Sequence, residues 1–486
     1  MTEFLHLRPL LTRLLVPLGA SLSVAALAVW SGSSGRPFLL SLLAIVIPLP
    51  LVIRALQRKF DPFEPIVILS LSFFVLFFLR PVAHLAYGEM TYGGMSIEGG
   101  FDRALLVAVT GVIAVYIGYA IGAGRGIARR LGPLPSTLKP EATIMVASGL
   151  LLVGIVLYAL YAEQIGGLAV ATEFLRGRAF QQEPVIGQST AYYRFGLYLA
   201  IPATLLLLEA AAAKRRALFV LLSALSTALF VVLITGPRGD RLWLLLLVMA
   251  IFVLRYLRAE RRPKARTLAV VGVLWFALGI TFLSDVRVPA ARDAPPIELL
   301  KKTAANPFRG WHDFILGGDT EMFAILALET ERVPSLKPHQ PGLTLVSLAT
   351  TWIPRRMYPD KVEPTDYEVY AMLFPDYAKI SRGGTAPSVF GGFYYDSGFL
   401  GVAIGAVLLG ILARALYEYL LAHPGSAGAR LVFAAMLPFI VVMVRGNPTD
   451  TVGRMAFIVF PIIVAVWWGG RREPRAAHGQ SVAAAP

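Results

Sequence analysis

Long apolar stretches recur along this chain of 486 residues, and they constrain its fold more than any other feature. Each of the twelve that we mark has roughly 16 to 22 residues, near the length of a helix that crosses a hydrocarbon core. The chain is 56% hydrophobic and 15% charged, whereas a soluble domain averages about 45 to 50% and about 25%. The sequence therefore predicts an all-α polytopic membrane protein and excludes a single soluble core and a transmembrane barrel. The twelve ranges are 14–30, 38–53, 65–79, 104–123, 143–162, 194–213, 217–234, 242–258, 267–284, 397–420, 431–445 and 452–469.

Basic residues are distributed unevenly between the two sides of such a membrane protein. With a cytoplasmic N-terminus, 23 Lys and Arg fall on cytoplasmic segments and 10 in the short loops of the other side. This bias follows the positive-inside rule and predicts that both termini are cytoplasmic. The net charge of +15 is thereby explained by the membrane, and no basic run with interleaved aromatic residues indicates nucleic acid.

The apolar ranges divide the chain into four parts. We expect a membrane domain at 1–284, an extracytoplasmic loop domain at 285–396, a second membrane domain at 397–470 and a cytoplasmic tail at 471–486. Within the long loop, residues 320–333 have the pattern of an amphipathic helix capped by Asp319 or Thr320. Residues 342–353 are apolar but too short to span, which favours a re-entrant or interfacial helix.

The short loop at 235–241 reads Thr-Gly-Pro-Arg-Gly-Asp-Arg and precedes an apolar range. Its glycines and proline predict a tight turn, and Arg238 and Arg241 stand three residues apart at the start of a helix. A helix N-terminus with two guanidinium groups suits a phosphate, because its first N–H groups have no partners. The alternative is that both arginines extend to lipid headgroups.

A second loop on the same predicted side, residues 445–454, repeats this design. Asn447, Pro448 and Asp450 predict a turn and a helix cap, and Arg445 and Arg454 flank them. Arg287, just after the ninth apolar range, is expected at the same level, where a simple interface anchor is the alternative. We therefore predict an anion site, suited to phosphate, made of Arg238, Arg241, Arg287 and Arg445.

The long loop supplies the candidates for a general base, namely His312, Asp313 and Glu321. Adjacent residues of a helix do not face each other, so His312 and Asp313 make no catalytic triad. Asp319 and Glu321 could be a metal motif, but a capping role for Asp319 explains them equally well. The chain has no cysteine, and no histidine or carboxylate cluster has convincing ligand spacing. We expect no metal and no cofactor.

Two segments of the long loop carry a family resemblance. Residues 353–361 read Ile-Pro-Arg-Arg-Met-Tyr-Pro-Asp-Lys, and residues 383–398 read Gly-Gly-Thr-Ala-Pro-Ser-Val-Phe-Gly-Gly-Phe-Tyr-Tyr-Asp-Ser-Gly. With them the chain resembles bacterial O-antigen polymerases of the Wzy type, whose long outer loop has a Pro-Arg segment before an aromatic-Pro-x-Lys-Pro sequence and later a Gly-Glu-x-Tyr-x-x-x-Gly sequence. Two departures stand out: Gly392 occupies the position of the family's Glu, and Val362 follows Lys361 in place of Pro.

The resemblance implies a GT-C-like glycosyltransferase that works at the outer face of the bacterial inner membrane. Its substrate would be an undecaprenyl-pyrophosphate-linked oligosaccharide, whose pyrophosphate would bind to Arg238, Arg241, Arg287 and Arg445. Its partners would be membrane lipid and a chain-length-regulating co-polymerase. Sugar contacts would come from Arg355, Tyr394 and Tyr395, and the rings of Trp311, Trp352 and Tyr358 could also stack on sugar faces. An interfacial aromatic belt is the alternative for all five aromatic residues.

Other functions share part of this pattern. An O-antigen ligase uses the same donor with a lipid A core acceptor, and the sequence separates it poorly from a polymerase. A glycosyltransferase that uses polyprenyl-monophosphate sugars usually has an acid in the first outer loop, and residues 31–36 contain none. A cell-wall polymerase of the shape-and-division type generally has ten spans. A non-enzymatic exporter of lipid-linked sugar predicts a polar cavity at mid-membrane, where these ranges are apolar.

Overall fold

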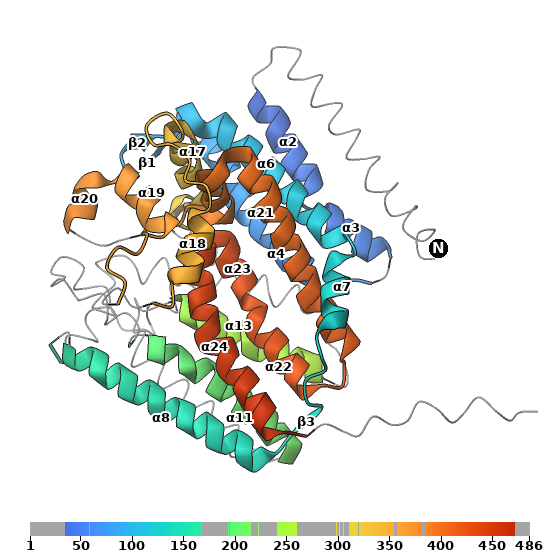
Figure 1. Cartoon of the computed structure of the whole chain (residues 1–486). Helices are drawn as coiled ribbons and strands as arrows, with labels where there is room; N and C mark the ends of the chain where they lie inside the picture. The colour runs from blue at the N-terminus through green and yellow to red at the C-terminus, as the bar shows by residue number, and fades with distance from the viewer. Residues whose placement is uncertain are drawn as a thin grey trace, which may run out of the picture.

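The computed structural model describes residues 35–57, 59–164, 166–167, 195–214, 241–259, 311–318, 320–353, 357–380 and 384–471, with a few isolated residues between them. Its helices gather into one bundle (Figure 1). The helices of the first half are α2 (Gly35–Val46), α3 (Leu49–Leu56), α4 (Pro65–Phe73), the π-helix η1 (Phe74–Leu79), α5 (Arg80–Tyr87), α6 (Glu98–Ala120), α7 (Ala123–Arg130), α8 (Pro140–Gln164), the 3-10 helix η2 (Phe195–Leu199), α11 (Ala200–Lys214) and α13 (Arg241–Arg258).

The second half of the chain is also helical. It contributes α16 (Trp311–Leu316), α17 (Met322–Arg332), α18 (Leu343–Thr350), α19 (Thr365–Leu373), α20 (Pro375–Ile380), α21 (Ser388–Ala422), α22 (Ala427–Met436), α23 (Pro438–Arg445) and α24 (Pro448–Gly469). The strands of the described residues have two residues each: β1 (Thr91–Tyr92) pairs antiparallel with β2 (Met95–Ser96), and β3 (Thr137–Leu138) with β4 (Gly470–Arg471).

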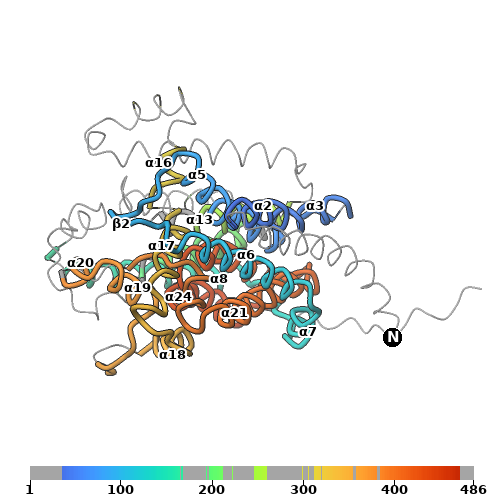
Figure 2. Tube along the Cα trace, turned by 90° about the horizontal axis from the view of Figure 1, so that it is seen from above, coloured from blue at the N-terminus to red at the C-terminus, as the bar shows by residue number. Residues whose placement is uncertain are grey.

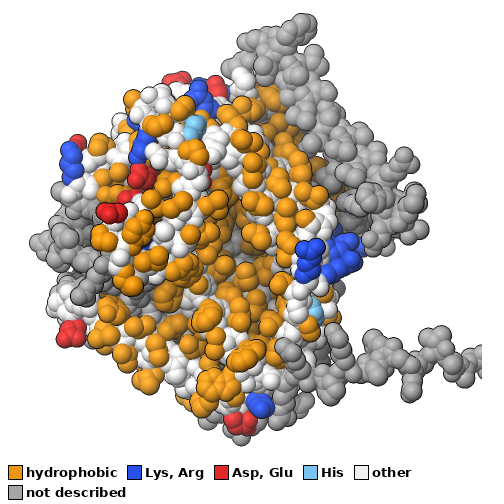
Figure 3. Space-filling model, viewed as in Figure 1, with side chains coloured by type: hydrophobic (Ala, Val, Ile, Leu, Met, Phe, Trp, Pro, Cys, Tyr) orange, Lys and Arg blue, Asp and Glu red, His pale blue; other side chains and the backbone are white. Residues whose placement is uncertain are grey.

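Seven helical segments of the described residues are long and apolar enough to cross a membrane. They are Gly35–Leu56, Pro65–Tyr87, Glu98–Ala120, Pro140–Gln164, Ser388–Ala422, Ala427–Arg445 and Pro448–Gly469. Each contains or overlaps one of the twelve predicted ranges, which confirms an all-α, membrane-spanning architecture. The range 194–213 falls on η2 and α11, and the range 242–258 lies within α13. The ranges 14–30, 217–234 and 267–284 lie outside the described residues, apart from the isolated Leu222. Hydrophobic side chains cover the middle of the face in Figure 3, and the charged ones lie mainly toward its margins.

Helix α21 packs most closely against α6, because glycines let the two backbones meet. A Cβ at Gly118 would lie 2.0 Å from the carbonyl oxygen of Val407, and one at Gly410 would lie 2.1 Å from that of Val115. Helix α21 is broken at Ser397 and Gly398, and Gly398 has a φ of 61° and a ψ of −146°, which is essentially restricted to glycine. The break falls at the predicted boundary between the long loop and the second membrane domain.

Helix α17 corrects one expectation. It begins at Met322 and its N-cap is Glu321, without a side-chain capping bond, so Thr320 does not have the predicted role, and Asp319 lies outside the described residues. Residues 322–330 are buried on every side, so the helix is not amphipathic with a solvated face. Seen from above, α17 lies among α5, α6, α19 and α21 (Figure 2). A segment of the predicted loop domain thus completes the core of the bundle, and this burial overrides the helix's sequence pattern.

The two ends of the bundle collect different segments. At one end β3 pairs with β4, Ser136 accepts a hydrogen bond from the amide of Ala427 at 3.0 Å, and Arg54 and Arg414 meet Glu64. The charge bias assigns all of these segments to one side of the membrane. The opposite end carries α16 to α20, the β1–β2 hairpin and the turn between α23 and α24. We call it the loop end (Figure 1).

Candidate functional site

The turn between α23 and α24 builds the centre of the candidate site at the loop end. Asn447 caps α24, as predicted: its Oδ1 accepts from the amides of Thr449 at 2.6 Å and Asp450 at 3.1 Å. Because its side-chain oxygen is bound in this cap, its Nδ2 points away from the helix and donates to Oδ1 of Asp366 at 2.5 Å. The cap therefore fixes a carboxyl group that is 81 residues distant in the sequence.

Asp366 stands in the first turn of α19, after Pro364. Burial and, to a smaller extent, the nearby charge of Asp450 raise its pKa to about 7, although two backbone amides and Arg454 oppose the rise. The other oxygen, Oδ2, lies beside Gly384: a Cβ at that position would stand 3.1 Å from it, so glycine lets the two segments pack closely here. A carboxylate that is half ionised near neutral pH is well suited to take a proton from a hydroxyl group.

Asp450 and Arg454 form an ion pair beside this carboxyl. Nε of Arg454 lies 2.9 Å from Oδ2 of Asp450, one helical turn earlier in α24. Its Nη1 donates to the hydroxyl of Tyr198 at 3.0 Å. The guanidinium is thus held close to the first turn of a helix whose N-terminus favours anions. The site combines a titratable acid with a fixed cation.

Arg445 and Glu321, two of the predicted site residues, both lie within electrostatic range of Tyr92. Nη2 of Arg445 lies 3.5 Å from the carbonyl oxygen of Gly318, and Glu321 accepts a hydrogen bond from the hydroxyl of Tyr92. Burial, together with the charge of Glu321, raises the pKa of the Tyr92 hydroxyl. The charge of Arg445 lowers the same pKa, but by less. The structure therefore brings a predicted anion-binding arginine and a predicted base to one place.

The loop that carries Glu321 is held by Arg80, whose side chain is fully buried. Its guanidinium donates to the carbonyl oxygens of Ile315, Leu316 and Gly317 at 2.6 to 3.2 Å and to Oγ1 of Thr320 at 3.0 Å. These carbonyls end α16, where a helix leaves its last acceptors without partners. Arg80 satisfies them and fixes the loop in one conformation.

The remaining predicted bases are on α16. His312 is about half exposed, and its Nε2 lies 3.3 Å from Oε1 of Glu89. Its ring meets the edge of Tyr87 at 4.8 Å between centroids, so it packs on α5 at the surface. The backbone of Asp313 belongs to α16, and its side chain lies outside the described part of the chain. His312 and Asp313 stay candidates, and Asp366 is the better-placed acid.

Tyr394 and Tyr395, the predicted sugar contacts, are buried at 3% and 0% exposure. Tyr394 donates to the carbonyl oxygen of Val333 at 3.3 Å. Nζ of Lys337 lies 5.8 Å from the ring centroid of Tyr395. Neither ring offers a face to a sugar in this conformation. Arg355, the third predicted contact, lies outside the described residues.

Most of the predicted pyrophosphate site cannot be placed. Arg238 and Arg287 lie outside the described residues. The backbone of Arg241 begins α13, as the sequence predicts, but its side chain is not among those described. Arg445 is thus the member of the predicted set whose position the structure gives.

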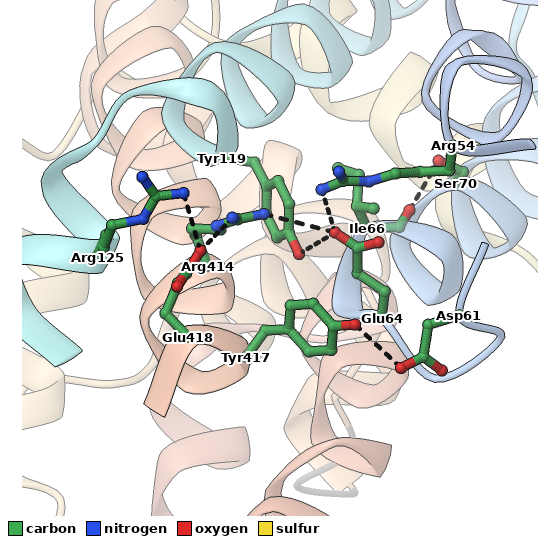
Figure 4. A network of polar contacts seen from close by, with 10 residues as sticks. All are labelled: Arg54, Asp61, Glu64, Ile66, Ser70, Tyr119, Arg125, Arg414, Tyr417 and Glu418. Atoms are coloured by element: carbon green, nitrogen blue, oxygen red, sulfur yellow. Dashed lines mark hydrogen bonds and ion pairs between the residues drawn. The ribbon is translucent and has the colours of Figure 1, made fainter. Parts of the chain in front are cut away.

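A second polar cluster lies at the end of the bundle opposite the loop end (Figure 4). The carboxylate of Glu64, 1% exposed, is bound by Arg54, by Arg414 at 3.5 Å and by the hydroxyl of Tyr119 at 2.9 Å. Glu418 binds Arg414 and Arg125, and Tyr417 donates to Asp61 at 3.0 Å. Three arginines balance three acids here, and Glu64 is enclosed. We interpret this cluster as a structural tie between α3, α6, α7 and α21.

The sequence contained Asp366 among the acids of the long loop, but nothing in it distinguished this residue from its neighbours. Its partner Asn447 was recognised as a cap, and the second use of that side chain becomes visible only in the fold. In the described residues, no group of three or more His, Cys, Asp or Glu side chains could hold a metal ion. Metal independence remains a prediction.

Comparison of the chain with protein-family models, curated proteins and solved structures finds no match. The class defined by the fold is a helical, membrane-spanning protein with a polar site at its loop end.

Proposed function

We propose that this protein is a lipid-dependent glycosyltransferase that polymerises oligosaccharide repeat units at the outer face of the bacterial inner membrane. A growing glycan on its polyprenyl pyrophosphate would be transferred to a hydroxyl group of another lipid-linked unit. The motif resemblance at 353–361 and 383–398 supports this class of reaction. The observation that carries the proposal is the carboxyl group of Asp366, whose pKa of about 7 suits a general base.

Asp366 has the position and the chemistry to activate the acceptor. Asn447 holds Oδ1, and Oδ2 lies beside the small residue Gly384. As the acceptor oxygen forms its bond to the anomeric carbon, its proton passes to Oδ2 and the bond from that carbon to the pyrophosphate oxygen breaks. Base catalysis of this kind contributes about 100- to 10,000-fold to the rate.

The pyrophosphate leaves as an anion and needs cations around it. Arg445 is two residues from Asn447, at the same turn, and supports the placing of the leaving group there. Arg238, Arg241 and Arg287 complete the set that we propose from the sequence. A preorganised donor contributes about 3 kcal/mol by analogy with oxyanion sites, so several arginines could replace a metal ion.

The test uses the purified full-length chain with polyprenyl-pyrophosphate oligosaccharide in detergent, and product length is followed on gels. Asp366→Asn should reduce chain extension by at least about 100-fold. Asp376→Asn is the matched control, because Asp376 is an exposed acid on the neighbouring helix α20. Normal extension by Asp366→Asn would overturn the assignment of the base.

The same assay separates the nearest alternative. A ligase would move the glycan to a lipid A core and would leave lipid-linked units unextended when the core is absent. Extension of lipid-linked units without lipid A core supports the polymerase. If glycan transfer occurs only when lipid A core is present, the protein is a ligase and the polymerase proposal is wrong.

A further inference from the structure

Glu329 is a buried carboxyl group that the proposed reaction does not use. It stands on α17 with 0% exposure, and neither of its side-chain oxygens has a hydrogen-bond partner. A carboxylate without partners in such a place would cost several kcal/mol, so a buried group of this kind takes up a proton. Burial raises the pKa of Glu329 well above its ordinary value, and the neighbouring Asp396 raises it further.

The groups that face Glu329 do not neutralise it. From α21, Asp396 adds a like charge, and Tyr394 and Tyr395 lie within electrostatic range. From α6, Arg103 donates to the carbonyl oxygen of Thr330 at 2.7 Å, and its positive charge lies within electrostatic range of the Tyr394 hydroxyl. Glu368 of α19 is bound to Lys337. The described surroundings of Glu329 therefore favour its neutral form.

The carboxyl group of Glu329 is enclosed by the first two turns of α21. A Cβ at Gly391 would stand 2.7 Å from Oε2 of Glu329, so the missing side chain is what makes room for the carboxyl. The segment Ser388–Asp396 ends at the break of Ser397 and Gly398. Its first residue, Ser388, has a φ of 69°, a strained value for a residue other than glycine. A short helical piece with irregular backbone at both ends thus closes over Glu329.

We infer that Glu329 is a proton switch for this segment: its carboxyl is protonated while Ser388–Asp396 packs on α17, and it ionises when the segment opens about the Ser397–Gly398 break. Gly384 and Thr385, which border Asp366, lie only three to four residues before Ser388, the first residue of this segment. Opening would therefore change access to the candidate site. This inference does not depend on the identity of the reaction, because it concerns only the conformation of α21.

The direction of the pH effect follows from proton linkage. The closed form binds a proton on Glu329 at pH values where the open form has released it. Raising the pH therefore favours opening, by up to about tenfold per pH unit between the ordinary pKa of a carboxyl and the raised value. Glu329→Gln keeps the shape of the neutral group and removes the titration.

The chain lacks cysteine, which permits a direct measurement. A cysteine at Val389, fully buried in the segment, and one at the exposed Ser335 are introduced in separate full-length proteins. Each is labelled with a maleimide between pH 5 and pH 8, and the ratio of the two rates removes the pH dependence of the thiol reaction. We expect this ratio to rise by at least tenfold over the range and to stay flat when Glu329→Gln is added.

Two further variants keep the test decisive. Glu331→Gln, an exposed acid on the same helix, should leave the rise intact. If Val389→Cys does not fold, a cysteine at Ser388, which is fully buried in the same segment, replaces it. A flat ratio in the protein with native Glu329, or the same rise with Glu329→Gln, would overturn the switch.

Discussion

Asn447 donates from Nδ2 to Oδ1 of Asp366 at 2.5 Å while its own Oδ1 caps α24. One side chain thus couples the start of a predicted membrane span to an acid of the long loop.

The two functions of Asn447 can be separated by mutation. Serine also caps helices well but lacks the Nδ2 donor. Asn447→Ser should therefore lower chain extension by about 10- to 100-fold, the equivalent of a hydrogen bond to a charged group, with little change in Tm. Asn447→Ala should lose about 1 kcal/mol of stability as well. Activity assays and thermal unfolding measure the two effects, and full activity of Asn447→Ser would show that the contact to Asp366 is dispensable.

The pH dependence of the reaction should report the pKa of Asp366. The base acts only when ionised, so the rate should rise with pH up to about 7 and then level off. Asp450→Asn removes a charge that raises this pKa, and we expect the acidic limb to move to lower pH. Because burial is the larger cause, the pKa should stay above the ordinary value. Initial rates from pH 5 to pH 9 provide the measurement. If the acidic limb of the pH profile does not move in Asp450→Asn, the group that titrates there is not Asp366.

The cluster around Glu64 should contribute to stability and not to chemistry. Glu64→Ala leaves Arg54 and Arg414 without their shared carboxylate in a largely buried place. Removing one partner of a buried ion pair costs about 3 to 5 kcal/mol. The variant should unfold at a lower temperature in detergent, and the fraction that remains folded should keep its activity. Glu98→Ala is the matched control, since Glu98 is an exposed acid 3.7 Å from Arg36. A stable but inactive Glu64→Ala protein would contradict the structural interpretation.

Arg241 tests the predicted pyrophosphate site. It begins α13, and lysine does not reproduce the bidentate geometry of a guanidinium group. Arg241→Lys and Arg241→Ala should both abolish long polymer at a normal level of membrane protein. Polymer length and protein abundance are measured in parallel. Normal polymer from Arg241→Ala would restrict its function to lipid contact, and equal losses of polymer and protein would make the residue structural.

Topology can be tested in the same cysteine-free chain. Ser335 and Asp376 are exposed at the loop end, and Gly425 is exposed in the turn between α21 and α22 at the opposite end. Cysteines at 335 and 376 should react with an impermeant maleimide added outside intact cells, and one at 425 should react only after the membrane is opened. The reverse pattern would place the loop end in the cytoplasm and remove the proposed outer-face reaction.

The sequence by itself determined the class of fold. Its apolar ranges exceed the length of a soluble core helix, and this property is local, so it can be recognised without knowing any contact. The cap at Asn447 and the start of a helix at Arg241 were likewise predictable, because helix ends depend on a few adjacent residues. Such features are confirmed where the structure describes them.

Only the tertiary structure decided which polar residues share a site. Asp366 meets Asn447, Glu321 meets Tyr92, and Arg80 holds the end of α16, and each pair is brought together by helix packing over long separations in sequence. The same packing buried residues 322–330 of α17 and enclosed Glu329, although the local pattern predicted a solvated face. Burial changes the pKa of an acid through desolvation, which depends on the atoms around it and not on its neighbours in the chain. The residues that the fold selects, Asp366 and Glu329, are therefore those that the sequence could not distinguish.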